Sequence, residues 1–85
     1  MVGKTLVVAN RLGLHARPAA LLARAAGRFK CHVRVAKGDI EVNSKSVMGL
    51  MMLAAECGSK LVVSCDGADE KEALAEIEKL FLDKF

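Results

Sequence analysis

The spacing of hydrophobic residues changes several times along the chain, and each change marks a different predicted element. Short apolar or alternating stretches predict four strands: one over residues 4–9, a hairpin over residues 31–42, and one over residues 60–66. Apolar residues at three- and four-residue spacings predict three helices, over residues 18–27, 46–55 and 69–85. The predicted elements therefore follow one another in the order βαββαβα.

This order of elements indicates an α+β fold. Two split βαβ units place four strands in one antiparallel sheet and their helices on the same face of it. We therefore predict an open-faced β-sandwich, in which three helices cover one face of a four-stranded antiparallel sheet and the other face is open to water. With 85 residues, 53% of them hydrophobic, the chain is expected to form a single domain over residues 1–85.

The sequence does not indicate membrane insertion or export. No apolar run approaches the ~20 residues of a membrane span, and the first residues lack the pattern of a signal peptide. Cys31, Cys57 and Cys65 form no Cys-x-x-Cys pair, so we expect neither a disulfide framework nor a zinc site, and interpret all three as small buried residues. We expect a cytoplasmic monomer that uses no metal or cofactor.

The formal net charge is only +3, but the charges are unevenly distributed. Residues 1–38 contain eight Lys or Arg and no Asp or Glu, whereas residues 39–85 contain five basic and ten acidic residues. One part of the surface should therefore attract phosphate groups, nucleic acid or an acidic protein. A small RNA-binding module is one alternative, but such modules stack bases on strand aromatics. The three aromatic residues here are phenylalanines outside the strand cores, so we expect no nucleic-acid partner.

The segment GLHARP, residues 13–18, places a histidine at the predicted start of the first helix. Pro18 favours a helix start because its missing N–H would have no intrahelical partner in the first turn. Unpaired amides at this end favour an anion and disfavour a second cation, so the His15 imidazole should be neutral and nucleophilic. A phosphoryl group on His15 would meet these amides and the guanidinium of Arg17. An ordinary exposed loop histidine is the alternative.

The sequence around His15 does not provide the other groups of an independent enzyme. No Asp or Glu precedes residue 39, so a general base is missing from this part of the chain. The second histidine, His32, lies in a predicted strand beside Cys31, and neighbouring strand residues point to opposite faces. We therefore interpret His15 as a group that accepts a phosphoryl group and passes it on. Whether the chain counts as an enzyme stays open.

Hydrophobic side chains are also expected outside the core. In the second helix Val47, Leu50, Leu53 and Ala54 can face the sheet, which leaves methionines exposed as an adaptable surface for a partner. A fully buried helix is the alternative. The exposed side of the first helix combines cations with small apolar groups. Together these features predict a docking patch that consists of Ala16, Ala20, Leu21, Arg24, Arg28, Lys45, Val47, Met48, Met51 and Met52.

Two segments resemble the HPr family, the histidine-containing phosphocarriers of the bacterial phosphoenolpyruvate-dependent phosphotransferase system. GLHARPAA, at residues 13–20, is similar to the phosphohistidine motif of the family, and NSKSVMGLMML, at residues 43–53, to its regulatory serine segment. The resemblance covers essentially the whole chain and implies an open-faced βαββαβα sandwich. It implies that His15 receives a phosphoryl group from enzyme I and passes it to enzyme IIA domains for sugar uptake, while Arg17 stabilises the phosphate.

The resemblance also gives Ser46 a second interpretation. By default Ser46 is a helix-capping serine, but it matches the serine that an HPr kinase/phosphorylase modifies in some bacteria. Transcriptional regulators are further partners that the resemblance implies. The nitrogen-related paralogue NPr shares a similar histidine motif and has a regulatory role instead of a transport role. The segment KSVMG, at residues 45–49, favours HPr over NPr.

Overall fold

A computed structural model describes residues 1–53 and 55–83 of the chain. Its elements follow one another in the predicted order βαββαβα. The strands are β1 (Val2–Val7), β2 (His32–Lys37), β3 (Ile40–Asn43) and β4 (Lys60–Asp66). The helices are α1 (Ala16–Gly27), α2 (Val47–Met52) and α3 (Glu70–Asp83).

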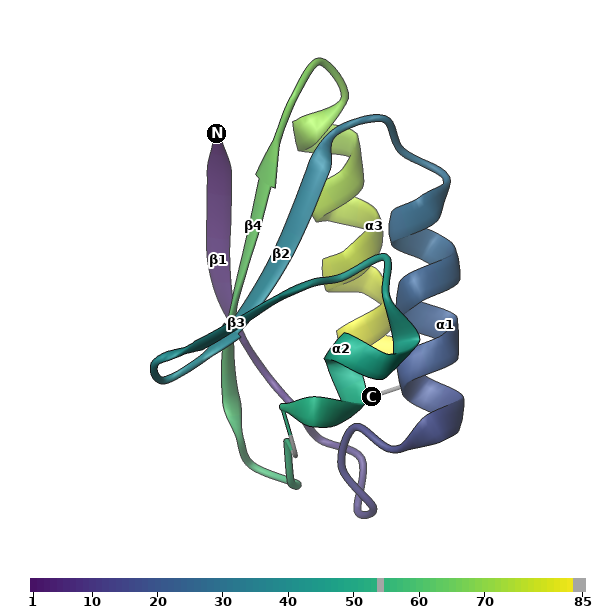
Figure 1. Cartoon of the computed structure of the whole chain (residues 1–85), viewed down its shortest axis with the longest axis vertical. Coiled ribbons are helices and arrows are strands. Elements are labelled where there is room, and N and C mark those ends of the chain that lie inside the picture. The colour runs from purple at the N-terminus through teal and green to yellow at the C-terminus, as the bar shows by residue number, and fades with distance from the viewer. Residues whose placement is uncertain (54, 84–85) are drawn as a thin grey trace.

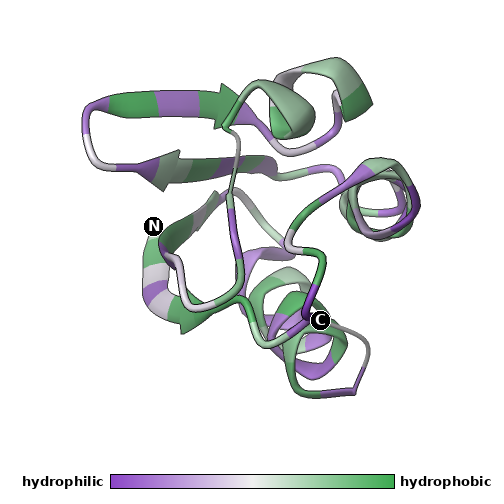
Figure 2. Cartoon of the chain, turned by 90° about the horizontal axis from the view of Figure 1, so that it is seen from below, coloured by the Kyte–Doolittle hydropathy of each residue, from purple (hydrophilic) through white to green (hydrophobic). Residues whose placement is uncertain are grey.

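The four strands form one antiparallel sheet in the order β1-β4-β2-β3. All three helices lie on one side of this sheet, and α2 packs against α1 (Figure 1). A view from below shows that the other side of the twisted sheet is not covered (Figure 2). The predicted open-faced β-sandwich, with three helices on one face of an antiparallel sheet, is confirmed.

The core lies between the sheet and the helices. Alternation along β2 turns Val33 and Val35 inward, where both are buried. Arg34, between them, points to the open face, where it pairs with Glu41 of β3 at 3.0 Å. Each helix adds one apolar face to this core, through Ala19, Leu22, Ala23, Ala26, Leu50, Ala73, Ile77 and Phe81. One stripe of each helix is therefore buried, as the spacing of the apolar residues predicts.

The second helix is shorter than the sequence predicts. It covers residues 47–52 instead of 46–55, because Ser46 caps its start and the chain leaves the helix at Leu53. Leu53 is still buried, and Ala55 then contacts the loop that precedes α1. Ala54, predicted to face the sheet, lies outside the described residues, as do residues 84 and 85 of the predicted third helix.

The three cysteines do not share one environment. Cys31 and Cys65 are buried as expected, but Cys57 is exposed, so the prediction for Cys57 is wrong. Cys57 lies in the turn before β4, where no strand or helix periodicity directs its side chain inward. Burial raises the pKa of the Cys65 thiol to about 11, with a further contribution from Cys31 beside it. Burial also raises the pKa of Cys31.

The start of α3 is tied to the connection between α1 and β2. The two carboxylate oxygens of Asp69 accept the backbone amides of Lys30 at 2.8 Å and Cys31 at 2.9 Å. These bonds lower the pKa of Asp69, the Lys30 amide having the larger effect. The carboxylate therefore provides hydrogen-bond acceptors for the backbone amides of Lys30 and Cys31.

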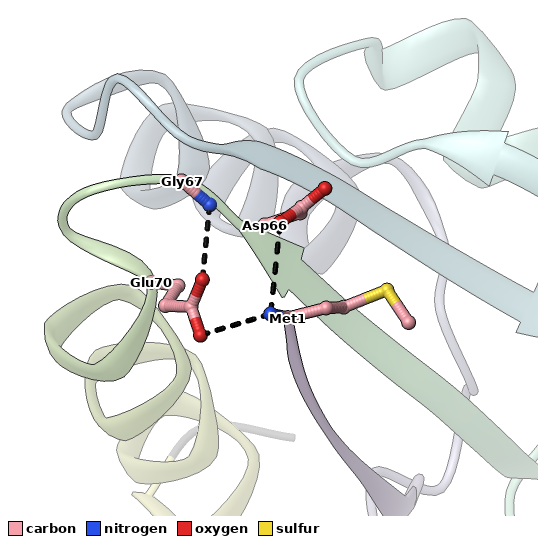
Figure 3. Close-up of polar contacts among 4 residues, drawn as sticks. All are labelled: Met1, Asp66, Gly67 and Glu70. Carbon is pink, nitrogen blue, oxygen red and sulfur yellow. Dashed lines mark hydrogen bonds and ion pairs between the residues drawn. The ribbon is translucent and has the colours of Figure 1, made fainter.

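A second carboxylate links the turn before α3 to strand β1 (Figure 3). Glu70 accepts the amide of Gly67 at 3.1 Å, and its other oxygen lies 3.2 Å from the ammonium of Met1. The same ammonium lies 3.6 Å from Asp66, at the end of β4. The Gly67 amide and the ammonium lower the pKa of Glu70, so the ionised carboxylate is favoured here.

Candidate functional site

His15 lies immediately before α1, at the N-cap position. Its backbone is extended, with φ −87° and ψ −167°, and its carbonyl accepts the amide of Ala19 at 2.9 Å. Within the described residues the imidazole makes no capping hydrogen bond, and the first turn of α1 contains no acidic residue. The side chain is half-buried. The ring therefore lies at the positive end of the helix dipole and does not cap the helix.

The first turn of α1 contains Arg17 and Pro18. Pro18 is buried and needs no hydrogen-bond acceptor at this position, which agrees with its predicted place at a helix start. Arg17 is exposed, and in the described part of the chain its guanidinium has no ion pair. An anion on His15 would therefore not compete with a carboxylate for Arg17.

The loop that leads to His15 is folded against the turn before β4. The Asn10 carbonyl accepts the amide of Gly13 at 2.9 Å and closes a tight turn. Leu14 is buried, and its amide donates to the carbonyl of Ala55 at 2.8 Å. The sequence pattern does not predict this contact. Its available signal was the turn-forming glycine two residues before the histidine, since Gly13 has φ 73°.

The methionines of the docking patch are exposed, as predicted. Met48 and Met52 are each 73% exposed and Met51 is 44% exposed, whereas Val47 is half-buried. Leu50, on the opposite side of α2, is completely buried. This short helix therefore has one face in the core and one face of flexible apolar side chains in solvent.

The part of the docking patch on α1 is also exposed. Ala16, Ala20 and Arg24 are exposed, and Leu21 is 36% exposed. Packing of α1 against α2 brings the two helices that carry the patch together. Arg28 is placed differently from the rest, because its guanidinium lies 3.7 Å from Glu76 of α3.

Ser46 caps the start of α2. Its Oγ accepts the backbone amide three residues later at 3.1 Å. The neighbouring Lys45 ammonium donates to the carbonyl of Phe29, just beyond the C-terminal end of α1, at 2.8 Å. The chain then reaches Ala55, which contacts the loop at the N-terminal end of α1. The Lys45 ammonium therefore contacts the chain beyond the C-terminal end of α1, whereas His15 and Ala55 lie at its N-terminal end.

Three further observations concern clusters of metal-binding side chains, the second histidine and the lengths of the helices. Among residues 1–53 and 55–83, no three His, Cys, Asp or Glu side chains gather closely enough to hold a metal ion. His32 is exposed and Cys31 is buried, so they point to opposite faces as predicted. No helix in the same part of the chain is long and apolar enough to cross a membrane.

Comparison with known proteins identifies the family. A family model described as "PTS HPr component phosphorylation site" matches residues 2–83. The phosphocarrier protein HPr of Treponema pallidum (strain Nichols) is 52% identical over 85 residues, which cover 100% of this chain and 97% of that protein. The crystal structure of HPr-C-His from Thermoanaerobacter tengcongensis has a TM-score of 0.96 and 40% identity, covering 100% of this chain and 96% of that chain. The fold and the matches to these proteins together define the class of protein as a phosphocarrier of the phosphotransferase system. The chain belongs to the HPr family.

The relatives also bear on three earlier expectations. Curated relatives named phosphocarrier protein HPr do not favour the NPr alternative, and family membership gives no support to an RNA-binding module. A crystal structure of an HPr dimer from Thermoanaerobacter tengcongensis is similar, with a TM-score of 0.79 and 39% identity over 99% of this chain and 97% of that chain. Because solved relatives include a dimer, the monomeric state of this chain stays a prediction.

Proposed function

We propose that this chain acts as a single phosphocarrier domain that accepts a phosphoryl group on His15 from enzyme I and passes it to enzyme IIA domains for sugar uptake. The position of His15 carries the proposal. Its imidazole makes no capping bond within the described residues and stands at the start of a helix whose first turn has no acidic residue. Arg17, two residues later, is exposed. Membership of the HPr family supports the same assignment.

The proposed reaction moves one phosphoryl group without net oxidation. An imidazole nitrogen of His15 attacks the phosphorus, a phosphorus–nitrogen bond forms, and the bond to the donor atom breaks with its electron pair leaving on the donor. The free amides at the start of α1 and the Arg17 guanidinium then stabilise the negative oxygens. The second transfer, to an enzyme IIA domain, repeats the step with His15 as the leaving group.

Incubation with enzyme I and phosphoenolpyruvate tests the assignment directly. The wild-type chain should acquire an acid-labile phosphoryl group, and His15→Ala should abolish this labelling. His32→Ala is the matched control, because His32 is an exposed histidine on the open face of the sheet. Label that persists in His15→Ala and disappears in His32→Ala would show that the assignment is wrong. Arg17→Ala should slow transfer or shorten the lifetime of the phosphohistidine while the fold stays intact.

The docking patch is the proposed contact surface for enzyme I and enzyme IIA in the cytoplasm. Exposed Met48 and Met51 supply adaptable apolar area, and Arg24 on α1 supplies positive charge. We expect acidic residues of the partner opposite Arg24. A chain that docks through this surface as a monomer keeps the patch available to each partner in turn.

We further propose that phosphorylation of Ser46 by an HPr kinase/phosphorylase slows transfer to His15. Because Ser46 begins the helix that carries the methionines, and its neighbour Lys45 contacts the end of α1 opposite His15, we expect the phosphate to act on docking instead of on the histidine itself. The phosphate adds a charge of roughly −1.5 to −2 beside the methionines. An acidic partner that docks there must desolvate this phosphate or leave it unpaired. Transcriptional regulators are further candidate partners of the modified chain.

Two substitutions at Ser46 test this regulation. Ser46→Asp should reduce the initial rate of enzyme I-dependent phosphorylation relative to Ser46→Ala, at enzyme I concentrations well below saturation. Melting curves should show both variants folded. Aspartate carries less charge than phosphate, so the difference should understate the effect of the modification. Equal rates for the two variants would leave Ser46 as a helix cap only.

A further inference from the structure

The loop before His15 is hydrogen-bonded to the turn before β4 near both of its ends. The amide of Val8 donates to the carbonyl of Ser59 at 3.0 Å, and the amide of Gly58 donates to the carbonyl of Val8 at 2.7 Å. At the far end of the loop, the amide of Leu14 donates to the carbonyl of Ala55 at 2.8 Å. Backbone bonds therefore join the loop to the turn at both ends, although more than forty residues separate the segments.

At Gly13 there is no room for a side chain between the two segments. Its φ of 73° is a backbone conformation that residues with a Cβ rarely adopt. A Cβ at this position would lie 2.4 Å from the Ala55 carbonyl oxygen and 2.9 Å from the Cα of Glu56, whereas ordinary contact begins at 3.4 Å. Both neighbours are backbone atoms, so a side chain at residue 13 would push the two segments apart by about 1 Å.

We propose that the close contact of Gly13 and Leu14 with the Ala55 carbonyl positions His15 for phosphoryl transfer, which makes Gly13 a positioning residue. This inference rests on the proposed role of His15. Leu14 is anchored in the core, and the next residue both caps α1 and carries the imidazole. A displacement at residue 13 is therefore transmitted to the ring. Phosphoryl transfer depends on alignment of the attacking nitrogen, and a misplacement of 1 Å can cost on the order of 100-fold in rate.

Two other glycines with positive φ, Gly38 and Gly67, provide matched controls. A Cβ at Gly38 would meet no atom within 4 Å, so Gly38→Ala introduces backbone strain without a collision. Gly67, with φ 153°, would place a Cβ 2.7 Å from the Cα and Cβ of Cys31. That collision lies beyond the C-terminal end of α1, at the opposite end of the helix from His15. Gly67→Ala therefore tests whether a backbone collision at the other end of α1 slows transfer as much as one beside His15.

The decisive measurement is single-turnover phosphorylation of Gly13→Ala and Gly67→Ala by phosphorylated enzyme I over a range of enzyme I concentrations. We expect Gly13→Ala to reduce the limiting rate at least tenfold and to change the half-saturating concentration less than twofold, because the docking patch is not altered. Gly67→Ala should lose at least as much thermal stability and keep the wild-type rate. Hydrogen exchange of the Leu14 amide should be at least tenfold faster in Gly13→Ala and unchanged in Gly67→Ala.

A second variant removes the same contact without adding an atom. Replacing the Leu14 amide by an ester eliminates the donor to Ala55 and should also lower the limiting rate, so it serves in place of Gly13→Ala if that variant does not fold. Wild-type transfer in a folded variant whose contact is broken overturns the inference, as does an equal loss of rate in Gly67→Ala. Failure of enzyme I to label the wild-type chain on His15 overturns the proposed function and this inference with it.

Discussion

Two substitutions in α2 separate its structural face from its docking face. Leu50 is completely buried, whereas Met48, two residues earlier, is 73% exposed. Leu50→Ala removes three buried carbon atoms and leaves a cavity beneath a short helix. Measured Leu→Ala losses range from about 2.7 to 5.0 kcal/mol, and a helix of six residues near the surface can partly collapse into the space. We therefore expect a loss near the lower limit, about 3 kcal/mol.

That loss should be visible as a large shift in melting temperature. For a domain of this size each kcal/mol lowers Tm by roughly 4–8 °C, so Leu50→Ala should melt about 12–24 °C below the wild type. Met48→Ala should change the free energy of unfolding by less than about 0.5 kcal/mol, because most of the side chain already contacts water. Differential scanning calorimetry of the three proteins at one pH and salt concentration provides the comparison.

The order of effects should reverse for binding to enzyme I. Loss of an apolar anchor from the centre of an interface costs about 1–2 kcal/mol, so Met48→Ala should weaken binding about 5- to 30-fold in isothermal titration calorimetry. Leu50→Ala, measured well below its melting temperature, should bind more tightly than Met48→Ala. A large stability loss in Met48→Ala, or wild-type affinity of that variant for enzyme I, would refute the assignment of this methionine to a docking face.

Two predictions concern titrating groups outside the site. The amides of Lys30 and Cys31 lower the folded-state pKa of Asp69, so its stabilisation is present above the unfolded-state pKa of about 4 and is lost as the pH falls through the folded-state pKa. Asp69→Asn should therefore flatten the acid side of the stability curve in urea titrations between pH 2 and 7, and an unchanged slope would contradict this. At pH 8 iodoacetamide should alkylate Cys57 rapidly and Cys31 and Cys65 only on unfolding, because burial raises the pKa of both buried thiols. Rapid alkylation of all three would show that the core opens readily.

Local patterns in the amino-acid sequence are enough to predict the elements and their order. Strand alternation around Val33 and helical spacing around Leu22 are local patterns, set by which side chains share a face within a few residues. The same locality placed His15 at a helix start, because Pro18 and the turn before it act on neighbouring backbone groups. Each of the three helices has one apolar face that must be buried against another element. Burial of all three faces against one side of the sheet predicts the open-faced sandwich.

The points at which distant segments meet depend on tertiary packing and could not be predicted from local patterns. The contact of Gly13 with Ala55 and the two bonds of Asp69 join residues about forty positions apart. The spacing of hydrophobic residues does not predict such pairs, because these contacts depend on how the loops close once the core has packed. The same packing exposed Cys57 and ended α2 early, at a residue whose own propensity would allow the helix to continue. It also brought the Lys45 ammonium to the end of α1 opposite His15, since the direction of one helix along another is fixed by side-chain packing between them.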